Sequence, residues 1–362
     1  MIAEKLKKPQ ALATSSVHER QFQRHFRLYR KHCFILLELQ VIQITDSRLK
    51  NVLVINYSQT GQLADITAQV VAPLEAAGHR VHLETLVPET PFPWPWPFVD
   101  FIDAFPECVQ LDAPPLKPLG IPADKRFDLV ILSYQVWYLS PSLPMTAFLL
   151  SPEGRRLIDG KPVVTLVACR NMWLSAQATM QRLIADAGGQ LRDHIAFTDR
   201  GHALATFITT PRWVLTGRRN RFFGLPPAGV APAEIRQASR FGRALADALD
   251  RDEEKAGNPM LTGLRACTVN PRLALSERAG LRAFRVWSRL IRAFGQRGQW
   301  RRRPLLLLFT LYLVTLIVTV VPLSLLIQSL LSPLLKPGLD RLRAELELPS
   351  GSQDFNLKKY EQ

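Results

Sequence analysis

The chain has 362 residues and a formal net charge of +15, with 47% hydrophobic and 21% charged residues. This is the composition of a folded chain, which excludes wholesale disorder, a collagen-like repeat and a polytopic transporter. The four cysteines form no C-x-x-C pair and the histidines show no close metal-ligand spacing, so the sequence predicts neither a metal site nor a disulfide framework.

The first 48 residues are basic and contain one short apolar run, Phe34–Leu37. This run is too short and lies too far from the start for a signal peptide, and no small-residue cleavage pattern follows it. We therefore expect residues 1–48 to be a poorly ordered extension.

Residues 49–250 alternate between apolar strand patterns and helical patterns. Strands are predicted at residues 51–56, 80–86, 127–133, 162–168 and 194–197. Helices are predicted at residues 63–77, 143–156, 173–187 and 233–249. Near-continuously apolar strands separated by helices are typical of a parallel sheet covered on both faces. The predicted fold is therefore a doubly wound α/β domain with a five-stranded parallel sheet.

An unusual insertion, residues 88–126, separates the second and third predicted strands. It contains ten prolines and the run Pro91–Phe98, which includes two tryptophans. Because proline removes a hydrogen-bond donor and fixes φ, we expect an extended, stiff loop without regular secondary structure. Two interpretations stay open: an aromatic lid or membrane-facing wall beside a ligand, or a surface loop whose tryptophans pack on the sheet edge.

The loop after the first predicted strand has the features of a phosphate site. In an open parallel sheet, ligands bind beyond the carboxyl ends of the strands. Ser58, Thr60, Gly61 and Gln62 lie there, just before a helix whose free N–H groups and dipole favour a phosphate. The loop matches neither the dinucleotide G-x-G-x-x-G pattern nor a Walker loop. Ordinary helix capping by Ser58 and Thr60 is the alternative.

Two further loops bring aromatic and polar side chains to the same edge. Val136, Trp137 and Tyr138 follow the third strand, and Cys169–Trp173 follows the fourth. Large aromatic side chains can lie against a planar ring. A phosphate-binding loop, an aromatic wall and a polar edge together favour a site for flavin mononucleotide (FMN).

These segments resemble known families. Tyr57–Gln62 resembles the phosphate loop of the flavodoxin family, and Val136–Tyr138 with Ser140–Met145 is similar to the second loop of the flavodoxin-like NAD(P)H oxidoreductases. More narrowly, Ala168–Trp173 and the apolar C-terminal segment resemble the flavodoxin-like proteins named dialkylresorcinol condensing enzyme. One departure is Leu63, which stands where flavodoxins usually have Thr or Ser and so removes a hydroxyl donor.

The resemblance covers roughly residues 51–249 and implies a flavodoxin-like fold, an FMN cofactor and NADPH or NADH as the hydride donor. The implied phosphate contacts are Ser58, Thr60, Gly61 and Gln62. The implied ring contacts are Val136, Trp137, Tyr138, Arg170, Asn171, Met172 and Trp173. Arg170 and Tyr138 are the predicted catalytic residues of a flavin-dependent oxidoreductase. Arg170 would stabilise the anionic reduced flavin unless it pairs with a carboxylate such as Asp199, and Tyr138 would stack on the ring or gate it.

Two other functions stay open. Cys169 ends a strand ahead of a helix N-terminus, a setting that lowers a thiol pKa, so it is a candidate nucleophile for acyl condensation. Its only candidate histidine partners are the scattered His194 and His202. The third function is a non-catalytic, membrane-tethered scaffold, which the substitution at Leu63 favours.

Residues 251–303 form a basic linker. Its last part, residues 278–303, contains nine arginines and no acidic residue, and apolar residues recur at helical spacing between 281 and 294. This pattern predicts an amphipathic helix on anionic lipid, with a helix packed on the main domain as the alternative. Nucleic acid is not a predicted partner, because a membrane segment follows directly.

Residues 304–335 carry no acidic or basic side chain. The stretch from Leu305 to about Ile327 is long enough to span a bilayer or to re-enter it, and two full crossings do not fit. Arginines at positions 301–303 place the bulk of the protein in the cytoplasm by the positive-inside rule. We therefore expect a single-pass membrane protein with a polar tail at residues 336–362.

The membrane segment favours a hydrophobic small-molecule substrate, such as an acyl resorcinol, a cyclohexanedione or a quinone, which concentrates in the bilayer. A ketosynthase is the partner that the narrower resemblance implies. The sequence leaves open whether the chain forms a homodimer, as many oxidoreductases of this kind do.

Overall fold

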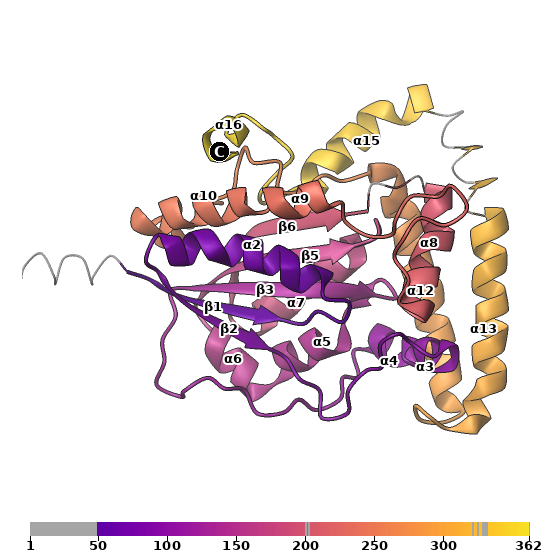
Figure 1. Ribbon diagram of the computed structural model, residues 1–362. Helices are drawn as coiled ribbons and strands as arrows, with labels where there is room; N and C mark the ends of the chain where they lie inside the picture. The colour runs from indigo at the N-terminus through magenta and orange to yellow at the C-terminus, as the bar shows by residue number, and fades with distance from the viewer. Residues whose placement is uncertain are drawn as a thin grey trace, which may run out of the picture. The chain divides into compact units, whose positions relative to one another are not determined.

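A parallel sheet carries the fold (Figure 1). Its strands are β1 (Asn51–Asn56), β2 (Arg80–Thr85), β3 (Leu129–Trp137), β5 (Pro162–Cys169) and β6 (Gln190–Thr198). They lie in the spatial order β2-β1-β3-β5-β6, and all four pairings among them are parallel. This is the flavodoxin-like doubly wound order, with its switch point between β1 and β3. The computed structural model describes residues 49–199, 201, 203–320, 322–323, 326–327 and 332–361. The extension predicted at residues 1–48 lies outside the described residues.

A sixth, two-residue strand was not predicted. It is β4 (Ser140–Pro141), which pairs antiparallel with the end of β3. The chain turns between the two strands through Tyr138 and Leu139, which have φ values of 50° and 61°. Two consecutive positive φ values are typical of the tight turn that joins hairpin strands. The sequence gives no signal for this turn, because neither position is Gly or Asn.

Side chains of the strands alternate between two cores. Leu53 and Ile55 of β1 point into one core, and Val52 and Val54 point into the other. The first core is covered by α5 (Leu143–Leu150), α6 (Pro152–Ile158) and α7 (Leu174–Asp186). The second is covered by α2 (Gln62–Ala76) and α10 (Ser239–Asp250). Helices therefore cover both faces of the sheet, as predicted (Figure 1).

Two predicted helices are each divided in the structure. The helix expected at 143–156 ends at Leu150, and Ser151 caps α6 by accepting a hydrogen bond from the Gly154 N–H at 2.9 Å. Pro152, which has no N–H to donate, occupies the first turn of α6. The helix expected at 233–249 is formed by α9 (Pro232–Gln237) and α10, with a short α11 (Glu253–Ala256) after it.

The insertion 88–126 contains two helices, so the prediction of a loop without regular structure was wrong in part. They are α3 (Phe98–Asp103) and α4 (Phe105–Gln110). Nine of the ten prolines lie before Phe98 or after Gln110, outside the two helices, and Pro106 lies in the first turn of α4, where a missing N–H costs little. Apolar side chains of these helices then pack against the C-terminal helices, which stabilises helical turns too short to form alone.

A chain of buried hydrogen bonds crosses the sheet at β5 and β6. The Tyr134 hydroxyl donates to Gln177, whose amide donates to the Thr165 hydroxyl, which lies 2.8 Å from Nδ1 of His194. The ring of His194 is fully buried and its Nε2 has no hydrogen-bond partner among the described residues, which disfavours the charged form of the imidazole. Burial lowers the pKa of His194 from 6.5 to about 3.

This histidine predicts a pH dependence of stability. Below pH 6.5 the unfolded chain binds a proton at His194 that the folded chain does not bind, so stability falls as the pH falls. Between pH 7.5 and 5.5 the wild type should lose about 1.4 kcal/mol more unfolding free energy than His194→Phe, as urea unfolding at both pH values will measure. Burial raises the pKa of the neighbouring Asp193 to about 6, which acts in the opposite direction but equally in both proteins. Identical pH dependence in the two proteins would contradict this role.

The basic linker contains a long helix that packs on the domain. This is α12 (Pro271–Ala293), which contacts α4, α7 and α15. Its Glu277 is fully buried and accepts a hydrogen bond from the Ser175 N–H, in the first turn of α7, at 2.6 Å. A carboxylate is favourable at a helix N-terminus, so Glu277 anchors α12 to the sheet domain. The arginines of α12 from Arg278 onward are exposed, and its contact with lipid stays a prediction.

The apolar segment begins with η1 (Trp300–Arg302), α13 (Arg303–Thr315) and a π-helical stretch, η2 (Leu316–Val320). The stretch Trp300–Val320 is the one helix among the described residues that is long and apolar enough to cross a membrane; its mean hydropathy is 2.1 and 11% of it is buried. Phe309 is buried and stacks on Phe105 of α4, with ring centroids 3.9 Å apart. The first turns of α13 therefore pack on the insertion and on α12.

The tail also packs on the domain. It comprises α15 (Ser332–Leu346) and α16 (Leu357–Tyr360). Tyr360 belongs to the core between α10 and the sheet, and its hydroxyl donates to Asp247. The described chain from Lys50 onward is one compact unit that includes this tail.

Candidate functional site

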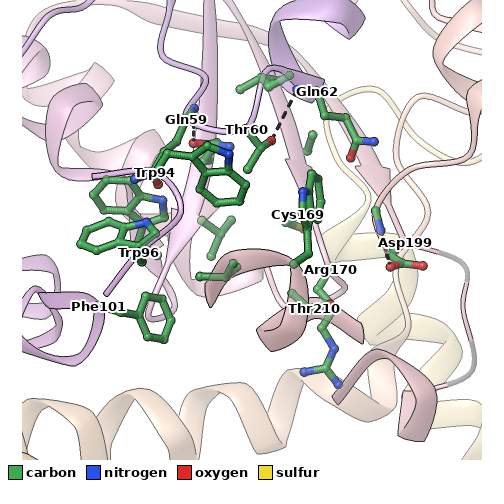
Figure 2. Close-up of a pocket in the computed structure, with 18 of the residues that line it drawn as sticks. Gln59, Thr60, Gln62, Trp94, Trp96, Phe101, Cys169, Arg170, Asp199 and Thr210 are labelled. Atoms are coloured by element: carbon green, nitrogen blue, oxygen red, sulfur yellow. Dashed lines mark hydrogen bonds between the residues drawn. The ribbon is translucent and has the colours of Figure 1, made fainter. Parts of the chain in front are cut away.

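A cavity of about 240 Å³ lies at the carboxyl edge of the sheet (Figure 2). The loops after β1, β3 and β5 contribute to it, together with the insertion, the residue after β6 and α8 (Ala203–Thr216). Predicted site residues that line it are Thr60, Gln62, Val136, Trp137, Tyr138 and Arg170. The structure thus brings the three predicted loops together at one cavity.

The predicted phosphate loop leads into α2, and the N-cap residue of this helix provides no side-chain cap. Gly61 is the N-cap of α2, has a φ of 83° and provides no side-chain cap. A Cβ at this position would have no heavy atom within 4 Å, so the space in front of the loop is open. The Thr60 hydroxyl accepts a long, 3.4 Å hydrogen bond from the Gln62 N–H, so the alternative of helix capping is observed, weakly, for Thr60. The first turn of α2 can therefore receive an anion.

Ser58 adds an unpaired hydroxyl to this loop. Its oxygen is buried and has no hydrogen-bond partner among the described residues, so the alternative of helix capping by Ser58 is not observed. A buried polar atom left without a partner costs about 1–3 kcal/mol. Ser58 and Gly61 do not line the cavity, but they lie in the same loop as Thr60 and Gln62, which do, so a phosphate held in front of this loop would give the hydroxyl a partner.

Gln62 has a structural role. Its side-chain amide donates to the Val230 carbonyl at 3.2 Å and accepts from the Val230 N–H at 3.0 Å. Gly229 precedes Val230 with a φ of 88°, and a Cβ there would lie 2.6 Å from the Gln62 oxygen and 2.8 Å from the ring of Trp213. Only glycine fits this position. The amide of Gln62 is thus occupied, which leaves phosphate binding to Ser58, Thr60 and the backbone.

Trp137 stands in a cluster of aromatic side chains. Its ring makes edge-to-face contacts with Phe92 at 4.9 Å, Trp96 at 5.5 Å and Tyr57 at 5.9 Å between centroids. Edge-to-face pairs stabilise a cluster beyond the area that they bury. The wall that Trp137 forms with Val136 is therefore held rigidly on the end of β3.

The tryptophans of the insertion line the cavity rather than packing on the sheet edge alone. Figure 2 shows Trp94, Trp96 and Phe101 on one side of it, across from Cys169 and Asp199. Trp94 packs edge-to-face on Trp213 of α8 at 6.1 Å. The insertion and α8 together close one wall of the cavity, which supports the interpretation as a wall beside a ligand.

Tyr138 lines the cavity, but its hydroxyl has a structural partner. The hydroxyl donates to the Phe101 carbonyl, and the ring packs on Phe101 and Phe105. Burial raises the pKa of this hydroxyl well above its ordinary value, so it holds its proton at neutral pH. We therefore assign Tyr138 to positioning the insertion rather than to proton transfer.

Arg170 is the one cation and Asp199 the one carboxylate among the residues that line the cavity. The Arg170 Nε donates to the Thr206 hydroxyl at 2.8 Å, and the guanidinium lies 3.7 Å over the ring of Phe207. Burial lowers the pKa of Arg170 to about 10, so the group stays charged at neutral pH. Asp199 accepts hydrogen bonds from the N–H groups of Gly201 and Gly229.

The other predicted residues of this loop lie outside the cavity wall. Asn171 and Met172 are half-buried, and the Asn171 side-chain oxygen is another buried atom without a partner among the described residues. Trp173 is buried in a separate cluster with Cys267 and Val269 and stacks on His194. A ring contact by these three residues stays a prediction, and for Trp173 the geometry favours a structural role.

Cys169 lines the cavity without the features of a nucleophile. Burial raises the pKa of its thiol well above the ordinary value, so the lowered pKa expected from the helix N-terminus is wrong. His194 pairs with Thr165, four residues before Cys169 on β5, which places it about 13 Å away along the strand. The other candidate partner, His202, lies outside the described residues.

A labelling experiment tests this conclusion about Cys169. Because the half-buried thiol is protonated, iodoacetamide at pH 8 should modify Cys169 much more slowly in the folded protein than in urea, as mass spectrometry of its peptide will show. Cys169→Ala should bind flavin as the wild type does. Rapid labelling of Cys169 in the folded protein, together with loss of function in Cys169→Ala, would instead support acyl condensation by Cys169.

Sequence reasoning missed the residues that follow β6. These are Thr210, Trp213, Val214 and Gly229; Asp199, which also follows β6, was considered only as a partner of Arg170. The carboxyl-edge rule applies to the fifth parallel strand as well as to the others, and Trp213 in an apolar stretch after that strand was the available signal.

No family model matches the sequence, and no curated protein matches it. Among solved structures 48 chains match. A flavoprotein in complex with FMN from Lactobacillus acidophilus is 15% identical over 41% of this chain and 93% of its own, with a TM-score of 0.34. A flavodoxin from the domain Archaea is 11% identical over 55% of this chain and 98% of its own, with a TM-score of 0.33. A flavone reductase is 13% identical over 56% of this chain and 64% of its own, with a TM-score of 0.31. These TM-scores lie below 0.5, and it is the strand order and register of the sheet that show the flavodoxin-like fold.

Proposed function

We propose that the chain binds FMN in this cavity and acts as a flavin-dependent oxidoreductase on a hydrophobic ring compound. The observation that carries the proposal is a loop with an unpaired Ser58 hydroxyl and a helix N-terminus without a side-chain cap at Gly61, whose Thr60 lines a cavity walled by aromatic rings. An anion site beside an aromatic wall matches the two chemically different ends of FMN.

The residues present fit this cofactor. Ser58, Thr60 and the first N–H groups of α2 would hold the phosphate, and Trp137 with Val136 would lie against the ring. Leu63 is fully buried in the core between α2 and the sheet, so the usual hydroxyl at this position is replaced by packing. When bound, the flavin supplies hydride or electron transfer.

The chain itself supplies charge and exclusion of water. Arg170, which lines the cavity and is fixed by Thr206 and Phe207 of α8, stays charged at neutral pH and would favour negative charge on a ligand. Trp94, Trp96 and Trp213 exclude water from the cavity wall, and charges interact more strongly where water is excluded.

The substrate and its location follow from the apolar helix. A lipid-like ring compound, such as an alkylated resorcinol precursor, a cyclohexanedione or a quinone, concentrates in the bilayer that Trp300–Val320 is suited to enter. The resemblance to dialkylresorcinol condensing enzymes supports an aromatising step that follows a separate ketosynthase. The flanking arginines favour a domain on the cytoplasmic side, where NADPH or NADH is available as the hydride donor.

Steady-state assays test the proposal. The detergent-purified chain with FMN should oxidise NADPH or NADH in the presence of a lipophilic quinone or cyclohexanedione, followed by absorbance at the nicotinamide band. Bound FMN that neither nucleotide reduces would refute the NAD(P)H-linked reaction while keeping the flavin site. If the chain does not bind FMN at all, the non-catalytic scaffold would be the function that remains.

A further inference from the structure

The upstream end of the apolar segment is fixed to the sheet domain by a buried ion pair. Arg302 is fully buried, with its Nε 2.8 Å from an oxygen of Asp103 and its two Nη atoms 2.9 and 3.0 Å from the oxygens of Glu107. The Asp103 carboxylate also accepts from the Gly298 N–H at 2.6 Å. Segment 304–335 thus starts at a point that cannot leave the domain without exposing or separating buried charges.

The downstream end returns to the same domain. Ser350 is fully buried; its hydroxyl donates to Asp193 at 2.8 Å and accepts from the His194 N–H at 2.7 Å. The Glu347 carboxylate accepts from the Val269 N–H at 3.1 Å. Backbone bonds from Cys267 to Gly351 and from Arg265 to Gln353 continue this contact. The tail is therefore part of the domain, on the edge formed by β6.

The packing of α13 divides its surface into two faces. Leu306 and Phe309 are buried against α4 and α12, while other apolar residues are exposed: Leu307, Leu308, Leu311 and Val314 of α13, and Val318 of η2. Phe98 and Val99 of α3, which contacts α13, are exposed as well. Both α13 and the neighbouring α3 thus present apolar side chains to their surroundings.

The contacts between α12 and α13 limit how deeply α13 can insert into a bilayer. Phe284 and Trp287 of α12 pack on Phe309 and Tyr312. The exposed arginines of α12, at positions 282, 285 and 289, lie at the same level of the helix pair. Moving each arginine to the centre of a bilayer costs about 2.5–3.5 kcal/mol on insertion scales. If lipid surrounded α13 on all sides at the level of these arginines, α12 would therefore have to detach from α13.

We propose that the segment 304–335 enters one leaflet of a bilayer and returns to the same side, with the exposed face of α13 in the hydrocarbon and both ends on the domain. The inference rests on the membrane association in the proposed function, and it replaces the single crossing that was predicted from the sequence. A single crossing would put the tail on the far side of the membrane, away from Asp193, His194 and Val269. The 32 residues of the segment, too short for two full crossings, are sufficient for a shallow re-entry.

Accessibility of a tag tests the inference. The full chain carries one epitope after residue 362 and, in a second version, one in the exposed loop at Phe223, and both are expressed in a bacterial inner membrane. In inverted vesicles, protease should remove both epitopes, and in intact spheroplasts it should remove neither. Detergent-solubilised membranes, in which both epitopes are accessible, are the control.

The alternative results are distinct. A C-terminal epitope accessible from the side opposite to the Phe223 epitope would overturn re-entry and restore the single crossing. Recovery of the protein from the soluble fraction as a dimer would show that a second copy covers the exposed face, which overturns membrane association as well. FMN binding, measured on the same preparations, is independent of both results, so failure of the flavin site would be recognised separately.

Discussion

Arg302→Met is expected to lower the free energy of unfolding by about 3–5 kcal/mol, the cost of removing one partner from a buried ion pair. The methionine fills most of the space of the aliphatic part of the side chain, so the loss is mainly electrostatic. Asp103 and Glu107 would remain side by side without a cation, and α4 would lose its link to the start of α13.

Guanidinium unfolding in detergent, followed by tryptophan fluorescence, measures this loss. The matched control is Arg301→Met, because Arg301 is the neighbouring residue and is exposed. Surface substitutions of this kind usually change stability by within about 0.5 kcal/mol. Equal small effects of both variants would show that Arg302 does not clamp the insertion to α13.

Ser58→Ala is expected to weaken FMN binding by roughly 10- to 100-fold while leaving the stability of the unliganded protein unchanged or slightly higher. The hydroxyl has no hydrogen-bond partner among the described residues, so its removal costs the fold nothing. A hydrogen bond to a charged phosphate contributes about 1.5–3 kcal/mol, which corresponds to this loss of affinity.

Ser151→Ala is the matched control for Ser58→Ala. Ser151 caps α6 by accepting from the Gly154 N–H, away from the cavity. Loss of a helix cap costs about 1 kcal/mol of stability, and FMN affinity should stay at the wild-type value. Isothermal titration with FMN and thermal unfolding of both variants separate the two effects. An unchanged affinity in Ser58→Ala would remove Ser58 from the phosphate site.

The sheet could be predicted from the sequence because its signal is local. Apolar runs such as Asn51–Asn56 and Pro162–Cys169 are recognisable one at a time, and parallel strands joined by helices leave few arrangements. The carboxyl-edge rule then placed the loops after β1, β3 and β5 at one cavity.

Features that depend on contacts between distant parts of the chain were not predictable. The helices α3 and α4 are stabilised by α12 and α13, which follow more than 150 residues later. Arg302 looked like one of three flanking cations, and only its contacts with Asp103 and Glu107 show it to be buried. The return of the tail through Ser350 likewise leaves no local pattern.

The site was predictable in its residue types and less so in their roles. Tyr138 and Gln62 lie at the cavity as predicted, yet hydrogen bonds to Phe101 and Val230 give both a structural task. Which atom of a loop residue remains unpaired depends on its tertiary partners, and Ser58 is the clearest example.

The most direct test of the flavin site is the visible absorption spectrum of the detergent-purified full chain titrated with FMN. The account predicts bands displaced from those of free FMN, saturating at one flavin per chain, and a much weaker displacement in Ser58→Ala. A spectrum that remains that of free FMN throughout the titration would contradict the flavin site and leave the chain as a flavodoxin-like scaffold.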